Sequence, residues 1–478
     1  MRAPLLILSA SALFVAACSS DSASPATIPA ATSPATEVTV GATDPVETTA
    51  APTTVEETTT TVEVGPADFT EEGAYAAGVR TISLGDRNME VWYPVDPASV
   101  AGADTEIFDQ LSVFPESLKA LIPAELQGEI DTGTYRDAAP FEGEALLPVV
   151  VYSHGFGGYR QVATNFTSHL ATWGYVVISI DHLERGLAAQ ASGTLGGGVP
   201  DQDVVDVSNG LDALRADSAL GALIDADEVV ITGHSAGAGT AARAANTLDD
   251  ILAFVSLSGG APGTTEAGDT GIRGVSSTLP NGTYEFTIDA VSDTALTITA
   301  DGATTDVPLD ALSFEAFGST LTLFAVTAPA GEAPAFNPGT VSFTIAAPTK
   351  PGLVIASELD EVIPPSRSLA LYEAMTGTRW YVEIAKAGHN SFTDSCVGIR
   401  ELGGLDALIP LLGEAQVKRA NDGCTDAFAD PLEVRDVTNQ YVVAFLRNEF
   451  GQPVDPAALT ESAIDGVGDI TLVQFASS

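Results

Sequence analysis

The chain has 478 residues and a formal net charge of −45, from 19 lysine and arginine residues against 64 aspartate and glutamate residues. A surface this acidic repels nucleic acid and anionic lipid, so the composition excludes proteins that bind either one non-specifically. With 45% hydrophobic residues, a chain of this length can bury a large core. The acidity has two interpretations that stay open: adaptation to a saline habitat, or the solubility of an exported protein.

The first 18 residues have the pattern of an export signal. Arg2 supplies a positive charge, Leu5 to Val15 form an apolar segment, and Val15-Ala16-Ala17 precede Cys18. The apolar segment is too short for a durable membrane span. The pattern resembles a bacterial lipoprotein signal, in which the signal is removed and a lipidated Cys18 becomes the anchor. An ordinary secretory signal is the alternative, and both predict an exported protein.

Residues 19–66 are rich in Ser, Thr, Ala, Pro and Glu and almost free of aromatic residues. Such a composition cannot bury enough apolar surface to fold. We therefore expect a solvated tether, which would leave the lipid as the only contact of the protein with the membrane.

The folded part is expected to open with a hairpin, because Gly78–Leu84 and Met89–Tyr93 alternate around the turn Gly85–Asn88. A segment near Ser117 to Leu126 has leucines at helical spacing, and Gln161–Thr172 is a predicted helix. Continuous apolar runs recur along the rest of the chain at Leu147–Ser153, Gly174–Ile180, Glu228–Thr232, Ala253–Ser258, Gly352–Ala356 and Arg379–Ile384. Apolar runs alternating with helical segments predict parallel strands covered on both faces, a doubly wound α/β sheet.

A glycine-rich loop follows the first of these strands as His154-Gly155-Phe156-Gly157-Gly158. Glycines there let backbone N–H groups turn toward a developing negative charge, as in an oxyanion hole. The spacing fits neither a dinucleotide-binding nor a P-loop motif. We predict the N–H of Phe156 as one donor.

The most informative stretch is Gly233-His234-Ser235-Ala236-Gly237, between the strand Glu228–Thr232 and an Ala-rich helical segment. A serine on such a strand-to-helix turn is typical of a nucleophile elbow, because a Cβ at the glycine positions would collide with the neighbouring strand and helix. We predict Ser235 as the nucleophile and the N–H of Ala236 as the second oxyanion donor.

Residues 261–348 break the α/β alternation between its two parts, 67–260 and 349–478. They contain period-two runs rich in Thr, Val and Phe, at Gly282–Ile288, Ala295–Thr299, Thr320–Ala325 and Gly339–Ile345. This predicts a small antiparallel β insertion. It could be a cap over the carboxyl edge of the sheet, where ligands bind, or a structural addition that packs elsewhere.

The base that activates the serine must be one of five histidines, His154, His169, His182, His234 and His389. The order serine, acid, histidine that this architecture imposes leaves His389, in a loop after the last apolar strand. His182 ends a strand and has a pocket-lining or structural role, and His234 points away from Ser235.

The acid is expected between Ser235 and His389, at the end of the strand Gly352–Ala356. Three carboxylates compete there: Glu358, Asp360 and Glu361. Asp360 is our choice, because the segment after it, ending in Val362 and Pro364, is the turn on which this acid usually sits; Glu358 is the alternative.

Cys396 and Cys424 remain once Cys18 is assigned to the lipid. An even pair in an exported protein predicts a disulfide. No C-x-x-C motif or histidine-rich cluster accompanies them, so we expect neither a metal site nor a catalytic thiol.

These motifs resemble α/β hydrolases of the bacterial group that includes platelet-activating factor acetylhydrolase-like and dienelactone hydrolase-like enzymes, with cutinase-type polyesterases as relatives. The residues that carry the resemblance lie within about 75–260 and 350–450, namely Tyr152–Gly158, Gly174–Val177 with Asp181-His182, Gly233–Gly237, Asp360–Pro364 and Gly388-His389. The resemblance implies the fold and a serine triad. The β insertion and the segment between Cys396 and Cys424 depart from the simplest members, so it does not define the substrate.

The sequence thus predicts an exported, membrane-tethered serine hydrolase of carboxylic esters, small or polymeric, acting as a monomer. Ser235 attacks the carbonyl, His389 transfers the proton, Asp360 orients His389, and Phe156 with its apolar neighbours lines the acyl site. Water hydrolyses the acyl-enzyme, so no cofactor is expected. Two alternatives remain: hydrolysis or transfer at another acyl bond, as in a lipase, peptidase or acyltransferase, or a non-catalytic surface binding protein with the insertion as its adhesive module.

Overall fold

The computed structural model describes residues 68–478 except 115, 120–128, 193–200, 326–333 and 410–412. The predicted signal, the lipidation site Cys18 and the tether lie outside the described residues. Of the helical segment predicted near Ser117 to Leu126, the described part holds α1 (Glu116–Lys119). No helix in the described part of the chain is both long and apolar enough to span a membrane.

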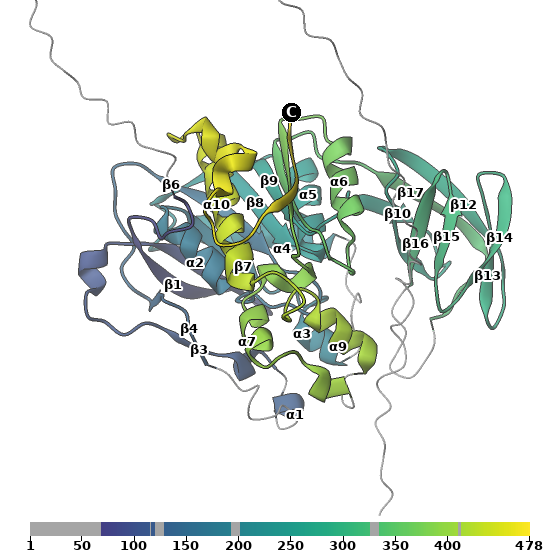
Figure 1. Ribbon diagram of the computed structural model, residues 1–478, viewed down its shortest axis with the longest axis horizontal. Coiled ribbons are helices and arrows are strands. Elements are labelled where there is room, and N and C mark those ends of the chain that lie inside the picture. Colours follow the sequence, from purple (N-terminus) through teal and green to yellow (C-terminus); the bar gives the residue numbers. More distant parts are fainter. Residues whose placement is uncertain (1–67, 115, 120–128, 193–200, 326–333, 410–412) are drawn as a thin grey trace, which may run out of the picture. The chain divides into compact units, whose positions relative to one another are not determined.

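A mostly parallel sheet forms the centre of the fold (Figure 1). Within the described residues it has ten strands, in the spatial order β20 (Leu472–Ser477), β19 (Arg379–Ile384), β18 (Gly352–Ser357), β9 (Ile251–Leu257), β8 (Ile224–His234), β6 (Leu147–Ser153), β7 (Val176–Ile180), β2 (Asn88–Val95), β1 (Ala76–Ser83) and β5 (Tyr135–Arg136). The six strands from β19 to β7 pair in parallel. The predicted opening hairpin β1–β2 is present and joins β7 antiparallel, as β20 joins β19. The predicted doubly wound α/β fold is confirmed.

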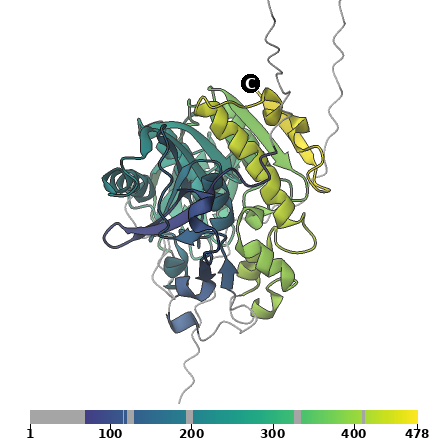
Figure 2. The same ribbon diagram turned by 90° about the vertical axis from the view of Figure 1, so that its left-hand side faces the viewer.

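Helices cover both faces of this sheet (Figures 1 and 2). Besides α1, the α-helices of the described residues are α2 (Thr164–Thr172), α3 (Leu187–Ser192), α4 (Gln202–Ala216), α5 (Ala236–Thr247), α6 (Pro365–Ala374), α7 (Ser395–Glu401), α9 (Glu414–Asn421) and α10 (Pro431–Glu449). Helices α2 and α10 pack with Val150 and Tyr152 of β6 in one core. Helices α4, α5 and α6 pack in a second core with Val149 and Val151 of the same strand. Successive side chains of a strand point to opposite faces, so one apolar run supplies both cores.

Two helices differ from the sequence expectation. Helix α2 begins at Thr164 rather than at Gln161, because Gln161 lies in a turn where its side-chain amide donates to Glu90 (3.1 Å). Helix α10 has no counterpart in the sequence analysis. Its buried residues, including Val437 and Phe445, complete the core over α2.

The β insertion has a core of its own. Its described strands form a sheet of five, β10 (Gly263–Glu266), β17 (Gly339–Ile345), β12 (Gly282–Val291), β13 (Ala295–Ala300) and β14 (Ala303–Pro308), and a sheet of three, β11 (Ile272–Ser276), β16 (Ser319–Ala325) and β15 (Ser313–Ala316). A separate two-stranded sheet, β3 (Ile107–Asp109) and β4 (Glu129–Asp131), lies earlier in the chain.

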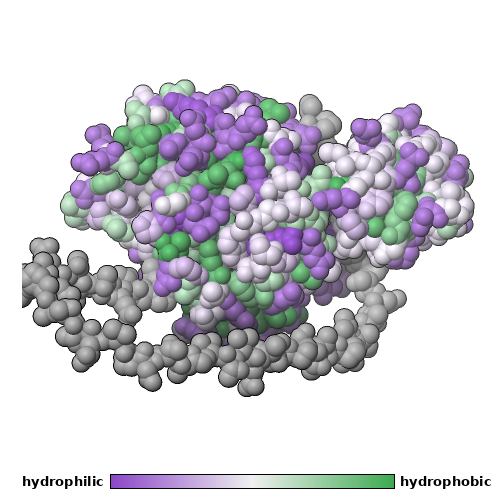
Figure 3. Space-filling view, turned by 90° about the horizontal axis from the view of Figure 1, so that it is seen from above, coloured by the Kyte–Doolittle hydropathy of each residue, from purple (hydrophilic) through white to green (hydrophobic). Residues whose placement is uncertain are grey.

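The pattern along β13 explains this separate core. Leu296 and Ile298 are buried, whereas Thr297 and Thr299, which alternate with them, bond to acidic or threonine side chains on the outer face. The surface of the insertion in Figure 3 is accordingly mostly white and purple, with scattered hydrophobic residues. Its stability therefore depends mainly on contacts within the insertion.

Candidate active site

The elbow between β8 and α5 holds Ser235 in a strained conformation. Its backbone has φ 57° and ψ −120°, outside the regions that a residue with a side chain prefers. The flanking glycines allow close packing: a Cβ on Gly233 would lie 2.1 Å from the Gly237 carbonyl oxygen, and one on Gly237 would lie 1.8 Å from the Ser153 carbonyl oxygen. The close packing of β8 and α5 places Ser235 at the tip of the turn between them, where it is partly exposed.

The structure brings together the three residues that the sequence assigns to catalysis. His389 Nε2 lies 2.9 Å from Ser235 Oγ, and His389 Nδ1 lies 2.8 Å from Asp360 Oδ2. The other oxygen of Asp360 accepts the N–H groups of Val362 (2.8 Å) and Ile363 (2.6 Å). These bonds fix the carboxylate so that Nδ1 of His389 carries a proton, which leaves Nε2 to accept the proton of the serine hydroxyl.

The two competing carboxylates have other partners. Glu358 accepts the N–H of Lys386 (2.8 Å), and Glu361 pairs with Nζ of Lys418 (2.6 Å). Neither is bonded to the His389 ring. The geometry therefore favours Asp360 over the alternative Glu358.

The glycine-rich loop passes directly beside the serine. A Cβ on Gly155 would lie 3.0 Å from Ser235 Cβ. The N–H of Gly157 donates to Arg185 O (2.8 Å), and that of Gly158 donates to Gly155 O (3.2 Å). In the described part of the chain, the N–H groups of Phe156 and Ala236 have no intramolecular acceptor. Both predicted oxyanion donors are therefore free to bind an oxygen of a substrate.

Asp422 supports this site and was missed by the sequence analysis. Its Oδ1 accepts the N–H of His389 (2.8 Å), and its Oδ2 accepts the N–H of Glu361 (3.0 Å). One buried carboxylate thus ties the loop of the base to the loop of the acid, and its burial raises the pKa of Asp422. The only sequence signal was its place two residues before Cys424.

The structure contains the predicted disulfide between Cys396 and Cys424, with an S–S distance of 2.04 Å. Cys396 lies in α7, which follows the His389 turn, and Cys424 lies beside Asp422. The bond therefore closes the chain segment that carries Asp422, and it joins the end of this segment to the helix that follows His389.

His234, next to Ser235, contacts the backbone of His389. Its Nε2 lies 2.8 Å from the His389 carbonyl oxygen, which can only accept, so Nε2 carries the proton. Burial, together with the neighbouring His389, lowers the pKa of His234 to about 3. His234 is therefore neutral near pH 7, and its Nε2 donates a hydrogen bond to the His389 carbonyl oxygen.

The β insertion reaches the glycine-rich loop through one arginine. The guanidinium of Arg273, on β11, lies over the ring of Phe156 at 5.6 Å and over that of Phe324 at 5.8 Å. Arg367 of α6 also donates to Thr322 of the insertion (3.2 Å). Arg273 thus covers part of Phe156, a residue of the predicted oxyanion hole whose side chain stays half exposed.

The described histidine and aspartate side chains at this site are not arranged to bind a metal ion. Across the described residues, no group of three or more His, Cys, Asp or Glu side chains could hold a metal ion. The groups placed around Ser235 are those of proton transfer and anion stabilisation.

The fold and the arrangement around Ser235 are those of an α/β hydrolase. The sequence matches the alpha/beta hydrolase family over residues 149–398, more than half of the chain, and the chain belongs to this family. Residues 86–195 match the family described as platelet-activating factor acetylhydrolase, isoform II, in agreement with the resemblance seen in the motifs.

Among solved structures, the chain is similar to a ferulic acid esterase from Streptomyces cinnamoneus. The two are 17% identical in sequence with a TM-score of 0.48, and the match covers 86% of this chain and 98% of that one. No curated protein sequence matches the chain.

Proposed function

We propose that this protein is an extracytoplasmic serine hydrolase that cleaves carboxylic esters through an acyl-enzyme. The observation that carries the proposal is the hydrogen-bonded series Ser235–His389–Asp360 beside the two free N–H groups of Phe156 and Ala236. Nucleophile, base, orienting acid and oxyanion donors are the complete set that acyl transfer requires.

The reaction follows from these positions. His389 Nε2 accepts the proton of Ser235 as Oγ attacks the ester carbonyl, and the two N–H groups bind the oxyanion that forms. His389 returns the proton to the leaving alcohol as the ester bond breaks. In the second half of the reaction, His389 removes a proton from a water molecule as the water oxygen attacks the acyl carbon. His389 then returns this proton to Ser235 Oγ as the bond between Oγ and the acyl group breaks, which releases the acid. Asp360 stays ionised and stabilises the imidazolium.

An ester substrate is supported by the match of residues 86–195 to an acetylhydrolase family, which also favours a short acyl group. Export is supported by the sequence pattern that ends in Cys18 and by the disulfide, since disulfides persist in oxidising compartments. The proposed anchor is the lipid at Cys18, and residues 19–66 are the proposed tether.

The test is hydrolysis of p-nitrophenyl esters of increasing acyl length by the purified chain and by Ser235→Ala, with the p-nitroanilide of the same acyl group as the amide control. We expect cleavage of the short esters by the unaltered chain, weak or no cleavage of the anilide, and loss of activity in the variant. Equal activity in the two proteins would exclude Ser235 as the nucleophile. Two inert proteins would favour the non-catalytic alternative.

A further inference from the structure

A second Ser–His–Asp array lies behind the active site. Ser153 ends β6, His182 follows β7, and Asp206 lies in α4. Ser153 Oγ is 2.9 Å from His182 Nε2, and His182 Nδ1 is 2.9 Å from Asp206 Oδ2, nearly the distances found around Ser235. The three residues are 0%, 1% and 1% exposed. No substrate can reach Ser153, so this buried array has another role.

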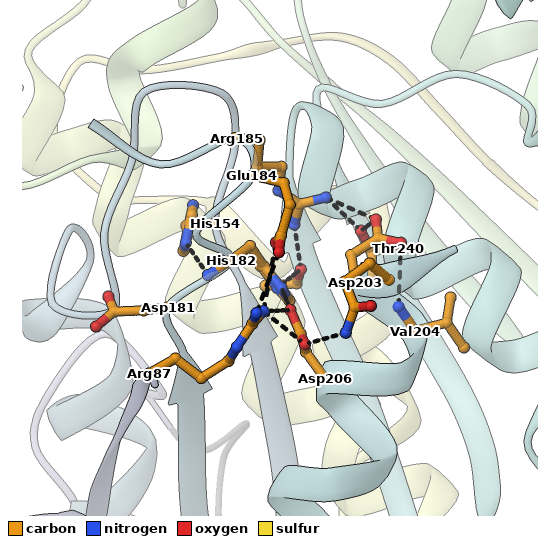
Figure 4. Close-up of polar contacts among 12 residues, drawn as sticks. Arg87, His154, Asp181, His182, Glu184, Arg185, Asp203, Val204, Asp206 and Thr240 are labelled. Carbon is orange, nitrogen blue, oxygen red and sulfur yellow. Dashed lines mark hydrogen bonds and ion pairs between the residues drawn. The ribbon is translucent and has the colours of Figure 1, made fainter. Parts of the chain in front are cut away.

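The partners determine the direction of each hydrogen bond in the buried array. The Asp206 carboxylate can only accept from His182 Nδ1, so Nε2 of the neutral ring carries no proton and accepts that of the Ser153 hydroxyl (2.9 Å). The Ser153 oxygen also accepts from Arg185 Nη2 (2.7 Å). His182 Nδ1 then donates to Asp206, whose carboxylate also accepts from Arg87 Nη1 (2.7 Å), as Figure 4 shows. His182 is thus held neutral, and burial together with Arg185 lowers its pKa well below the ordinary range.

His154 connects the buried array to the glycine-rich loop. The backbone N–H of His182 donates to His154 Nε2 (3.1 Å), so the proton of the neutral His154 ring is on Nδ1 and is donated to the Gly155 carbonyl oxygen (2.9 Å). In a trans peptide the C=O and the following N–H point in opposite directions. By holding the Gly155 carbonyl, His154 therefore sets the direction of the Phe156 N–H.

Arg185 joins the same loop to the nucleophile helix. Its carbonyl oxygen accepts the N–H of Gly157 (2.8 Å). Its guanidinium is buried and donates to Thr240 of α5 and to Asp203 of α4, both at 2.7 Å, in addition to Ser153. Helix α5 begins at Ala236, the residue with the other free N–H. Arg185 thus contacts both structural elements that carry oxyanion donors.

We propose that the buried array and Arg185 are positioning residues that fix the two oxyanion donors, Phe156 N–H and Ala236 N–H, relative to each other. The inference rests on the proposed function, because it concerns the donors of that reaction. Such pre-set donors stabilise charge in the transition state more than they bind the neutral ester. Loosening them therefore lowers kcat and leaves KM nearly unchanged.

The experiment compares Arg185→Gln and Thr240→Val with the unaltered chain. Each is measured for kcat and KM on a short p-nitrophenyl ester, for inhibition by an arylboronic acid, which forms an anionic tetrahedral adduct on serine, and for thermal unfolding. Arg80→Gln is the matched control. Arg80 lies on β1 and pairs with Asp217, the residue that follows α4, and it has no contact with the buried array.

We expect Arg185→Gln to lower kcat about 10–100-fold, less than complete loss of a donor, with KM within about threefold and boronate affinity reduced by a factor similar to kcat. Thr240→Val, which removes the hydroxyl that bonds to Arg185, Asp203 and the Ala236 carbonyl oxygen with little change in size, should lower both about 3–10-fold. If Arg185→Gln does not fold, Thr240→Val decides alone. An active unaltered enzyme whose folded variants keep kcat and boronate affinity within twofold would overturn the inference, whereas an inert unaltered enzyme would instead overturn the proposed function.

Discussion

The described part of the protein contains two Ser–His–Asp arrays that share their connectivity and nearly their distances but differ in the exposure, backbone conformation and neighbours of the serine. Around Ser235 the serine is partly exposed, its backbone is strained at φ 57°, and two N–H groups beside it have no acceptor within the described residues. In the buried array, Ser153 is the last residue of a regular strand, is fully buried, and receives a hydrogen bond from Arg185.

The comparison teaches that the spacing of three side chains does not define a catalytic site. A nucleophile also needs access, a free lone pair and donors for the developing oxyanion. Ser153 has no access to a substrate, and its oxygen already accepts a hydrogen bond from Arg185. The hydrogen bonds of the buried array instead connect β6, β7 and α4 to one another and, through His154, to the glycine-rich loop.

Removing each serine hydroxyl separates the arrays most strongly. Ser235→Ala should lower kcat by about 10⁴-fold or more, since a triad without its nucleophile keeps only oxyanion and binding effects. Ser153→Ala should lower kcat by about tenfold or less, as expected for a change in donor positions. Steady-state kinetics on one ester measures both, and comparable losses would remove the distinction between the arrays.

Exchanging each aspartate for asparagine gives the next largest contrast. Asp360→Asn should lower kcat by about 10³–10⁴-fold, because the amide favours the wrong tautomer of His389. Asp206→Asn changes the partner of His182 and weakens the contacts of Asp206 with Arg87 and Gln202, and we expect a loss of about 10–100-fold. Kinetics at pH 7 and 8 checks the order, which a larger effect of Asp206→Asn would reverse.

The disulfide should matter for both stability and activity, because it closes the segment that holds Asp422 against His389. Replacing both cysteines with serine should lower the free energy of unfolding by about 3.6 kcal/mol, the chain-entropy value for cysteines 28 residues apart. We also expect kcat to fall by up to about tenfold, since effects of loosened catalytic geometry are of this order. Urea unfolding and kinetics of the double variant test this, and unchanged kcat would mean that Asp422 positions His389 without the disulfide.

The contact between the insertion and the glycine-rich loop offers a smaller test. Arg273→Ala removes the guanidinium that stacks on Phe156, a contact worth about 0.5–2 kcal/mol, so we expect KM to rise about 3–10-fold with kcat nearly unchanged. Arg379→Ala is a matched control, because Arg379 stacks on Tyr372 at 5.0 Å at the start of β19, the opposite end of the strand from the site. Equal KM values in both variants would favour an insertion that is not a cap.

The smallest effect is on pH dependence. His182 is neutral in the folded protein with a lowered pKa, but an unfolded histidine titrates near 6.5. The unfolded state therefore binds more protons below pH 6.5, and this histidine lowers stability progressively as pH falls, by up to about 2 kcal/mol at pH 5. His182→Gln should flatten the fall in the urea midpoint between pH 7 and 5. An unchanged slope would show that the pKa of His182 is the same in the folded and unfolded states, which would contradict a lowered pKa.

Much of the fold and of the candidate site could be predicted from the local sequence. The elbow around Ser235, the glycines after β6 and the chain order that singles out His389 are short motifs whose chemistry is legible without tertiary structure. Apolar runs predicted the parallel strands because burial on both faces requires them.

Contacts between distant segments were not predictable in this way. Asp422 lies 33 residues after His389 and meets it only through the packing of two loops. Asp206 and Arg185 are ordinary polar residues of α4 and a turn, and nothing in their local sequence indicates that they converge behind β6. His182 was expected to line a pocket or to be structural, and its contacts are those of the second role.

The most direct test of the account is to identify the serine that reacts with an alkyl fluorophosphonate. The account predicts one adduct per chain, found by peptide mass spectrometry on Ser235, and complete loss of labelling in Ser235→Ala but not in Ser153→Ala. An adduct on Ser153, or labelling that survives in Ser235→Ala, would contradict it.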